Sequence, residues 1–316
     1  MSAPRVLLVK FSAIGDCVMA LSAATAIRQE HPEAYLAWAI YPRCAPVVDT
    51  DRLVDLLFEV PRDRWKQGGP GSSIPSQIRH FLQLRQYRFD VGIDLQGHSK
   101  TAVCLRLAAP KRRVSIRATD VFSRLIAPPI PAPPHDRHEM ERNSDALRAA
   151  GFLGGTPTPI LPDLGTAPDE VPGLQGERPL ATIAVGAGLP KKLYPLEAWA
   201  SVARGLLARG YRVGFLGGPG ETAPAVEGAT DWVGRLSLRQ TMAAVSASAV
   251  HLAADTGTGH MAAAYGVPVV TVFGPTSSAR YRPYTQRGIV LEGGASAANV
   301  PPDRALEAAL TLAEGV

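Results

Sequence analysis

The residues best suited to chemistry in this chain lie in the segment 255–260, which has the sequence DTGTGH. An apolar run at 250–253 precedes this segment, and the small residues 261–264 follow it. A strand, a tight turn and a helix start would gather the N–H groups of the first helical turn and the positive end of the helix dipole at one point. Small side chains let a phosphate approach the backbone closely. We therefore predict that this segment is the cradle of a nucleotide diphosphate.

The segment has two alternative roles. Asp-Thr-Gly-Thr also opens the active site of pepsin-like proteases, but those proteins are all-β and need a second such aspartate. Here the segment stands in an alternating strand–helix pattern, which disfavours that class. A purely structural glycine turn, with Asp255 or Thr256 capping the helix, is the stronger alternative.

Two further strand ends in the same half of the chain carry glycine-rich turns. Residues 186–192 (GAGLPKK) lack the third glycine of a dinucleotide fingerprint, which weakens the case for hydride chemistry, and Lys192 suits a phosphate as a point charge. Residues 217–221 (GGPGE) end with Glu221, which can accept from ribose hydroxyls or merely favour a helix N-terminus. A solvated lysine is the alternative for Lys192. The convergence of Lys192, Glu221 and Asp255 is stronger evidence than any single motif.

The first half of the chain offers a carboxylate and a basic strip. Gly15-Asp16 follows the first apolar run and places a carboxylate at a helix start, where capping the helix is the alternative role of Asp16. The strip with Lys111 and Arg113 is typical of a solvated face, yet it could meet an acidic acceptor. No aromatic residues interleave with it and no nucleic-acid motif accompanies it, so we predict no nucleic-acid partner.

Metal and nucleophile chemistry have weak support. His135 and His138 stand near Glu139 and Glu141, but their spacing matches no zinc site. No Gly-x-Ser-x-Gly elbow is present. We therefore predict neither a metal nor a cofactor.

Aliphatic runs alternate with helix-forming stretches along the chain, which predicts parallel sheets covered on both faces. We expect strands at 5–10, 35–41, 55–60, 90–94, 113–116, 180–185, 211–216, 250–254 and 267–273. We expect the segment 11–16 to turn into a helix that runs to about residue 30. We expect further helices at 76–86, 99–108, 138–150, 195–208, 221–228, 238–247 and 302–313. Residues 62–75 are expected to form a mobile loop, and residues 127–134, with five prolines, an extended connector.

Size and composition favour two globular domains. The 316 residues exceed the usual size of one domain, and 46% of them are hydrophobic. We predict an N-terminal acceptor-binding domain at 1–160, a linker at 161–178 and a C-terminal nucleotide-sugar domain at 179–316, whose last helix is a candidate to pack back on the first domain. No apolar run is long enough to span a bilayer, and we expect no signal peptide. Three scattered cysteines favour a reduced, cytoplasmic protein. The net charge of +5 allows anionic partners.

Several segments together resemble glycosyltransferase family 9, the ADP-heptose:lipopolysaccharide heptosyltransferases. Residues 10–16 (KFSAIGD) are similar to the family's opening motif, and residues 90–97 (DVGIDLQG) to its D-x-x-I-D-x-Q-G segment. Residues 192–195 (KLYP) resemble its K-x-W-P element, and residues 138–143 the helix before its linker. Residues 255–260 are similar to its D-T-G-x-x-H site, and GPT at 274–276 follows as in the family. The resemblance covers nearly the whole chain.

The resemblance implies a GT-B fold, in which two doubly wound Rossmann-like α/β domains face a central cleft. It implies an inverting, metal-independent transfer of heptose from ADP-heptose to a lipopolysaccharide core acceptor. Asp16 would be the general base, and the donor side would comprise Gly188, Lys192, Glu221, Asp255, Thr256, Gly257 and His260. Lys192, Thr256 and Gly257 would bind the diphosphate, Glu221 the ribose and Asp255 the sugar, with His260 beside the phosphates. The acceptor side would comprise Ser12, Gly15, Gln96, Lys111 and Arg113.

Two positions depart from the family pattern. Gly188 stands where many members carry Ser or Thr, and Tyr194 replaces the usual Trp, which bears on donor affinity and donor choice. The alternatives to lipopolysaccharide heptosyl transfer are a relative that uses another nucleotide sugar or a small-molecule acceptor, and a nucleotide-sugar-binding protein without transfer activity. A peripheral contact with the inner membrane is compatible with the expected cytoplasmic location.

Overall fold

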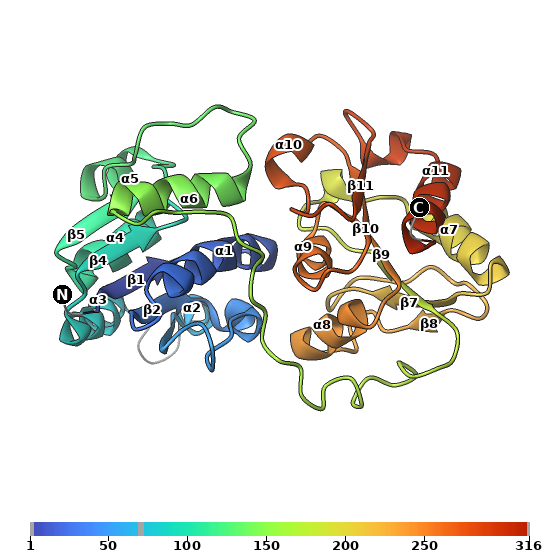
Figure 1. Ribbon diagram of the computed structural model, residues 1–316, viewed down its shortest axis with the longest axis horizontal. Coiled ribbons are helices and arrows are strands. Elements are labelled where there is room, and N and C mark those ends of the chain that lie inside the picture. Colours follow the sequence, from blue (N-terminus) through green and yellow to red (C-terminus); the bar gives the residue numbers. More distant parts are fainter. Residues whose placement is uncertain (1–2, 69–72, 315–316) are drawn as a thin grey trace. The chain divides into compact units, whose positions relative to one another are not determined.

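The chain forms two compact α/β units. The computed structural model describes residues 3–68 and 73–314, and the chain divides into Met1–Pro162 (unit 1) and Asp163–Val316 (unit 2) (Figure 1). Each unit contains one sheet whose strands are all parallel, with helices on both faces. This confirms the predicted class of two doubly wound α/β domains.

Unit 1 has a five-stranded sheet in the order β3-β2-β1-β4-β5. The central strand β1 is aliphatic and buried from Val6 to Val9, because helices cover it on both sides. Its Leu7 pairs with Ala37 of one neighbour and Gly92 of the other. The strands are β1 (Arg5–Val9), β2 (Tyr35–Ile40), β3 (Leu56–Glu59), β4 (Val91–Asp94) and β5 (Arg112–Ser115).

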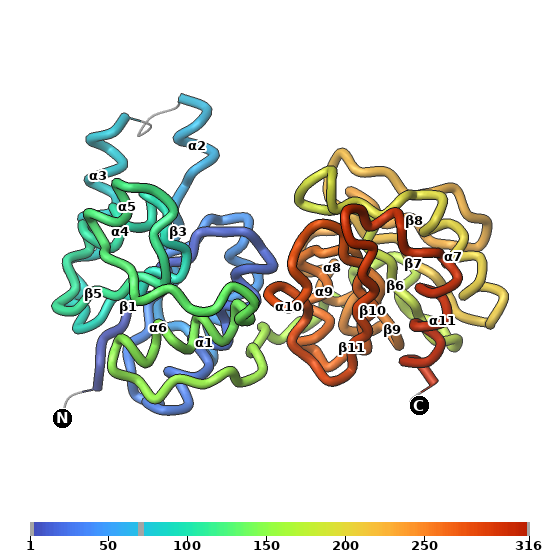
Figure 2. Tube along the Cα trace, turned by 90° about the horizontal axis from the view of Figure 1, so that it is seen from above, coloured from blue at the N-terminus to red at the C-terminus, as the bar shows by residue number. Residues whose placement is uncertain are grey.

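The helices of unit 1 lie in two layers (Figure 2). On one face α1 (Ile14–Glu30) packs against α6 (Glu139–Ala150), and on the other α3 (Ile74–Leu82) packs against α4 (Ser99–Ala108). These helices confirm the predicted ones, with ends that differ by a few residues. The short α5 (Val121–Ile126) was not predicted, because six residues are too few to show a helical period.

The prediction of a mobile loop over residues 62–75 was wrong for much of that segment. Arg62–Lys66 form α2, and α3 begins at Ile74. Trp65 of α2 meets Phe81 of α3 edge-on, with ring centroids 5.7 Å apart, and so provides an apolar anchor. The glycines, prolines and serines around it concealed this anchor in the sequence. Residues 69–72 of the predicted loop lie outside the described residues.

Unit 2 has a six-stranded sheet in the order β11-β10-β9-β6-β7-β8. One face is covered by α7 (Leu196–Ala208) and α11 (Pro302–Ala313), which pack against each other, and the other by α8 (Leu238–Ser246) and α9 (Gly257–Ala264). The last helix therefore packs within unit 2. The strands are β6 (Leu180–Ala184), β7 (Arg212–Leu216), β8 (Thr230–Asp231), β9 (Val250–Ala254), β10 (Val269–Phe273) and β11 (Gly288–Glu292). The short β8, β11 and α10 (Ser278–Tyr281) were not predicted.

The predicted helix at 221–228 was wrong, because this segment has no regular structure. Pro224 disfavours the helical conformation at the residue before it and removes a backbone donor. The Glu221 carboxylate instead accepts a hydrogen bond of 2.7 Å from the Gly218 N–H, which holds a tight turn.

Both sheets have a topological switch point, where the strand order reverses. It lies between β1 and β4 in unit 1 and between β6 and β9 in unit 2. In such folds ligands bind outside the carboxyl ends of the strands beside the switch point. The motif 10–16 follows β1, and residues 95–97 of the motif 90–97 follow β4. The motifs 186–192 and 255–260 follow β6 and β9. Across the described residues, no helix is long and apolar enough to cross a membrane.

Candidate functional site

In unit 2, an ion pair joins the two strand ends at the switch point. Lys192 ends a short 3-10 turn after β6, and Asp255 directly follows β9. Lys192 Nζ lies 2.7 Å from Asp255 Oδ2, and the Thr276 hydroxyl donates to the same oxygen at 2.7 Å. The Asp255 side chain is 8% exposed and that of Lys192 20%. The structure therefore brings Lys192 and Asp255 together, and adds Thr276 from the end of β10, which was not among the predicted site residues.

The helix that follows Asp255 starts without a side-chain cap. Thr256 is the N-cap residue of α9, but its side chain makes no bond to the first turn. The Thr256 hydroxyl instead lies 3.1 Å from that of Thr258. The Asp255 carboxylate is bonded to Lys192 and Thr276, so the capping roles considered for Asp255 and Thr256 have no support in the described hydrogen bonds. The first-turn N–H groups of α9, which begins at Gly257, thus lie at the same sheet edge as the ion pair.

Glu221 and two glycines shape the neighbouring strand ends. The Glu221 carboxylate lies so close to Gly186 that a Cβ at this glycine would overlap it. Glu221 therefore sits over the ends of both β6 and β7 only because position 186 has no side chain. Gly188 is different, since a Cβ there would meet no atom within 4 Å. His260 lies one turn into α9 and is 7% exposed.

Tyr194, one of the two departures from the family pattern, belongs to the core of unit 2. Its side chain is 1% exposed and its ring meets Trp199 edge-on at 4.6 Å. The Tyr194 hydroxyl donates to the Val300 carbonyl at 2.8 Å, and burial raises the pKa of this phenol to about 12. The replacement of Trp by Tyr therefore acts on packing.

In unit 1, the ends of β1 and β4 are clamped together at the switch point. The Gln96 side-chain carbonyl accepts from the Phe11 N–H at 2.8 Å and from the Ser12 N–H at 3.4 Å. Gly15 and Asp16 stand in the first turn of α1, and Asp16 Oδ2 accepts from the Ala13 N–H at 3.1 Å. The capping role considered for Asp16 is thus present. The structure brings Ser12, Gly15, Asp16 and Gln96 to one edge of the sheet.

Asp94 fixes the turn that carries Gln96, whose side chain joins the two strand ends. It is 0% exposed, and its Oδ1 accepts from the N–H groups of Gln96 and Gly97, each at 2.9 Å. Burial raises the pKa of Asp94 to about 6. Gly97 has a φ of 79°, and a Cβ there would overlap the Arg117 backbone. Asp94 was not among the predicted site residues. Its position two and three residues before the N–H groups of Gln96 and Gly97 is the spacing of an Asx turn, and this signal was present in the sequence.

Lys111 and Arg113 do not join the other acceptor-side residues. Lys111 precedes β5, at the sheet edge opposite to Asp16, and is bound to Asp90 at 2.7 Å with a 79% exposed side chain. Arg113 lies exposed on β5. The acidic residues near His138 are engaged as well, since Glu139 pairs with Arg117. Within the described ranges no group of three or more His, Cys, Asp or Glu side chains is arranged so that it could hold a metal ion.

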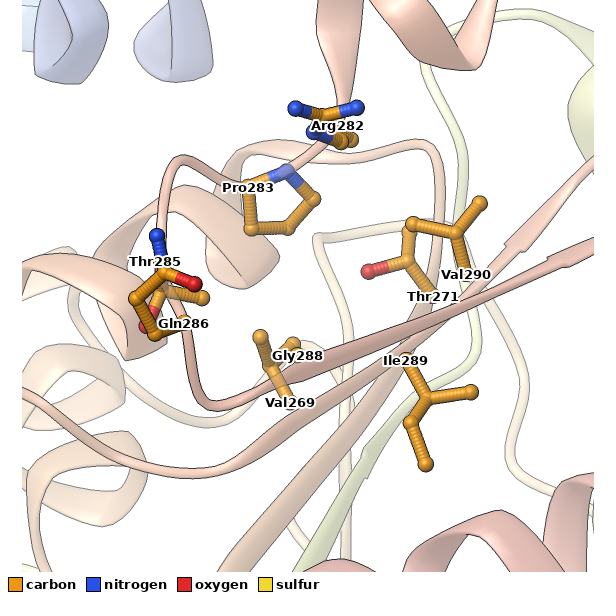
Figure 3. Close-up of a pocket in the computed structure, with 9 residues that line it drawn as sticks. All are labelled: Val269, Thr271, Arg282, Pro283, Thr285, Gln286, Gly288, Ile289 and Val290. Carbon is orange, nitrogen blue, oxygen red and sulfur yellow. The ribbon is translucent and has the colours of Figure 1, made fainter.

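Each unit also has a cavity. An apolar one of about 190 Å³ in unit 1 adjoins the clamp through Phe11, and its other walls are Tyr41, Val60, Arg62, Trp65, Ile74, Gln77, Ile78, Phe81, Ser99, Lys100 and Val103. A more polar one of about 350 Å³ in unit 2 lies between β10, β11 and the segment 282–286 (Figure 3). None of the predicted site residues lines this second cavity.

A family profile matches more than half of the chain. The profile of glycosyltransferase family 9 (heptosyltransferase) matches residues 77–301. A relative, lipopolysaccharide heptosyltransferase 1 of Pseudomonas aeruginosa, is 27% identical over 286 residues, which cover 86% of this chain and 79% of that protein.

Solved structures show the same fold. The family 9 glycosyl transferase of Veillonella parvula superposes with a TM-score of 0.84 at 19% identity, covering 100% of this chain and 99% of that one. The E. coli heptosyltransferase WaaC, solved with ADP, gives a TM-score of 0.75 at 22% identity, covering 96% and 98%. These likenesses support the GT-B assignment of the two parallel-sheet domains.

Proposed function

This chain belongs to glycosyltransferase family 9 (heptosyltransferase), and from that premise we propose that it transfers a heptose from ADP-heptose to a lipopolysaccharide core acceptor with inversion. The observation that carries the proposal is the Lys192–Asp255 pair beside the uncapped start of α9. The relative from Pseudomonas aeruginosa is a lipopolysaccharide heptosyltransferase, and the E. coli protein of the same fold was solved with ADP. Both names support the donor and acceptor classes.

On the donor side, the first-turn amides of α9 and Lys192 would neutralise the diphosphate. Amides and a lysine that are already in place stabilise a leaving anion without reorganisation, so the transfer does not require a divalent ion. Asp255 would hold Lys192 in place and contact the sugar, and Glu221 would accept from ribose hydroxyls. Gly188 and His260 would flank the phosphates.

On the acceptor side, Asp16 would act as the general base, with Ser12, Gly15 and Gln96 shaping its surroundings. The acceptor hydroxyl oxygen forms a bond to the anomeric carbon, the bond from that carbon to the diphosphate oxygen breaks, and the hydroxyl proton passes to Asp16. An aspartate carboxylate is in general a weak base at neutral pH. It would therefore take the proton as the transition state, with its oxocarbenium character, develops.

Lys111 and Arg113 are left out of the proposed acceptor site, because they lie away from the strand ends that carry Asp16. The apolar cavity beside Phe11 supports the alternative of a small-molecule acceptor instead. Trp65 and Phe81 line this cavity, and Arg62 and Lys100 stand at its wall, which fits an apolar group next to an anionic one. Competition between lipopolysaccharide core fragments and such molecules in the transfer assay distinguishes the two acceptors.

The surface of α5 supports the proposal that this is a cytoplasmic enzyme with a peripheral membrane contact. Figure 2 places α3, α4 and α5 together, and these helices contain no Asp or Glu. Their exposed cations are complementary to anionic lipids, each contributing about 1 kcal/mol near such a surface. The exposed side chains of α5 include Val121 (76%), Phe122 (54%) and Leu125 (76%). The exposed cations are Arg79, Lys100, Arg106 and Arg124.

The Asp16→Asn variant tests the proposed reaction, because the amide oxygen can still accept from the Ala13 N–H. We expect turnover of ADP-heptose to fall by about 10²- to 10⁴-fold while the Kd for ADP is unchanged. Asp303→Asn, which alters a carboxylate in the first turn of α11, is the matched control and should leave both values unchanged. Full turnover in Asp16→Asn would remove Asp16 as the base. A wild-type protein that binds ADP-heptose without turnover would establish the binding-protein alternative.

A further inference from the structure

A continuous chain of hydrogen bonds runs from the interior of unit 2 to the start of α9. Ser248 Oγ lies 2.7 Å from Thr182 Oγ1, which lies 2.8 Å from His251 Nδ1. His251 Nε2 lies 3.0 Å from Thr258 Oγ1, which lies 3.1 Å from Thr256 Oγ1. Thr182 and His251 are 0% exposed, so water does not compete for the two inner bonds, whereas Thr256 and Thr258 at the outer end are half-buried. We call these five residues the relay.

The direction of the inner bonds follows from counting protons, since each hydroxyl has one to give. Ser248 gives its proton to the Ala244 carbonyl, at 2.8 Å. Ser248 Oγ must therefore accept from the Thr182 hydroxyl, whose proton is then used. Thr182 in turn accepts from His251, so the ring proton of His251 is on Nδ1.

The outer bonds follow from the charge of His251. Burial lowers the pKa of this imidazole to about 3, so the ring is neutral and carries one proton only. With that proton on Nδ1, Nε2 accepts from the Thr258 hydroxyl. The Thr258 oxygen then accepts from the Thr256 hydroxyl. The proton of Thr256 points back into the protein, and a lone pair faces outward.

We propose that His251 is a positioning residue that makes the Thr256 hydroxyl a hydrogen-bond acceptor, which selects a hydroxyl group of the donor sugar over an oxygen of the diphosphate. This inference rests on the proposed donor site at α9. Diphosphate oxygens carry no proton to give, so the diphosphate is held by amides and Lys192, and Thr256 contributes affinity only for a group that has a proton. His251 sets this polarity without touching the ligand.

An outward-donating Thr256 hydroxyl costs one of the hydrogen bonds described above. For Thr256 to donate outward, either its own hydroxyl turns away and the contact with Thr258 loses its proton, or every proton in the relay reverses and Ser248 must donate to Thr182. The bond from Ser248 to the Ala244 carbonyl then has no proton. The relay as described satisfies all five contacts, whereas its reversal satisfies four.

The tautomer of His251 is the direct test, read from long-range 15N–1H spectra of the wild-type protein with 15N-labelled histidine. We expect Nδ1 to carry the proton, both alone and with ADP present. Thr182→Val removes the Nδ1 acceptor and should move the proton to Nε2. Thr271→Val is the matched control, because Thr271 is a buried threonine on the neighbouring strand outside the relay. It should leave the tautomer unchanged. A proton on Nε2 in the wild-type protein overturns the proposal, even if Thr182→Val does not fold.

Binding measurements test the selective role of Thr256. Thr256→Val should raise the Kd for ADP-heptose by about 3- to 10-fold and leave the Kd for ADP within twofold, while Thr256→Ser retains both values. A tenfold loss of ADP affinity in Thr256→Val would show that this hydroxyl donates to the diphosphate, and would overturn the proposal. If the wild-type protein binds neither ligand, the proposed donor site itself fails. The tautomer, which requires no ligand, then separates that failure from an error in the relay.

Discussion

Replacing Lys192 by Met distinguishes an ion pair that holds strand ends together from a cation that serves only a ligand. Lys192 Nζ lies 2.7 Å from Asp255 Oδ2, and the Asp255 side chain is 8% exposed. Without the ammonium group, this carboxylate keeps Thr276 as a partner and loses its charged donor. A hydrogen bond to a charged group contributes about 1.5–3 kcal/mol. We expect a loss of about 2 kcal/mol in the unfolding free energy of unit 2, which lowers its Tm by about 4–8 °C.

A double-mutant cycle with Asp255→Asn measures the pair itself. Removing both charges leaves no buried charge unpaired, so the double variant should recover about 1–2 kcal/mol of the summed losses. Lys191→Met, which changes the exposed neighbouring lysine, is the control and should alter stability by less than about 0.5 kcal/mol. Thermal unfolding without ligand gives the stabilities. Strictly additive losses would refute the structural coupling.

The same variants answer the binding question by titration calorimetry with ADP. Loss of a charged hydrogen bond to the diphosphate should raise the Kd for Lys192→Met by about 10- to 100-fold. Lys191→Met should bind ADP as the wild-type protein does. An unchanged Kd in Lys192→Met would remove Lys192 from the diphosphate site, whatever its contribution to stability.

Three further outcomes are expected. The pKa of Asp94 is about 6 in the folded protein against an ordinary 3.8, so the stabilisation by its protonated form is complete below pH 3.8 and is lost as the pH rises through about 6. Asp94→Asn should flatten this pH dependence and raise the unfolding free energy by up to about 3 kcal/mol at pH 7.5, measured by urea unfolding. An unaltered pH profile would contradict this expectation. Gly188→Ser should tighten ADP binding several-fold, because the space around Gly188 has room for a hydroxyl group. Gly186→Ala should weaken ADP binding, because its Cβ would overlap the Glu221 carboxylate. Equal effects of the two variants would refute this difference between the two glycines. Leu125→Glu should reduce sedimentation with phosphatidylglycerol vesicles, while Leu153→Glu, 79% exposed but outside α3–α5, should not; equal losses would exclude α5 as the contact.

The sequence predicts the fold well wherever a helix or strand is long, and wherever a strand is buried on both faces of its sheet. A run such as 5–9 is aliphatic throughout because helices cover both faces of its strand, and this leaves a signal that needs no structure. Short elements leave no such signal. The two residues of β8 and the six of α5 are stabilised by neighbours and caps, and the proline in 221–228 outweighed the helix formers around it.

The candidate site was predictable up to the level of the strand ends. Parallel strands present their carboxyl ends at one edge, so Lys192 and Asp255 could be expected to meet before any distance was known. Side chains that act through other side chains were not predictable in this way. Thr276 reaches Asp255 from the loop after a third strand, and His251 appears in the sequence only as a polar residue in a buried strand.

The two departures from the family pattern show why a substitution needs its surroundings before it has a meaning. In the sequence, Gly188 and Tyr194 both bear on donor affinity, since both stand within or beside the same motif. The structure separates them. Tyr194 is enclosed by Trp199 and bonded to the Val300 carbonyl, so a ligand cannot reach it and its effect is confined to packing. Gly188 is exposed at the strand end with open space around it, and any effect on donor affinity is therefore to be sought at Gly188.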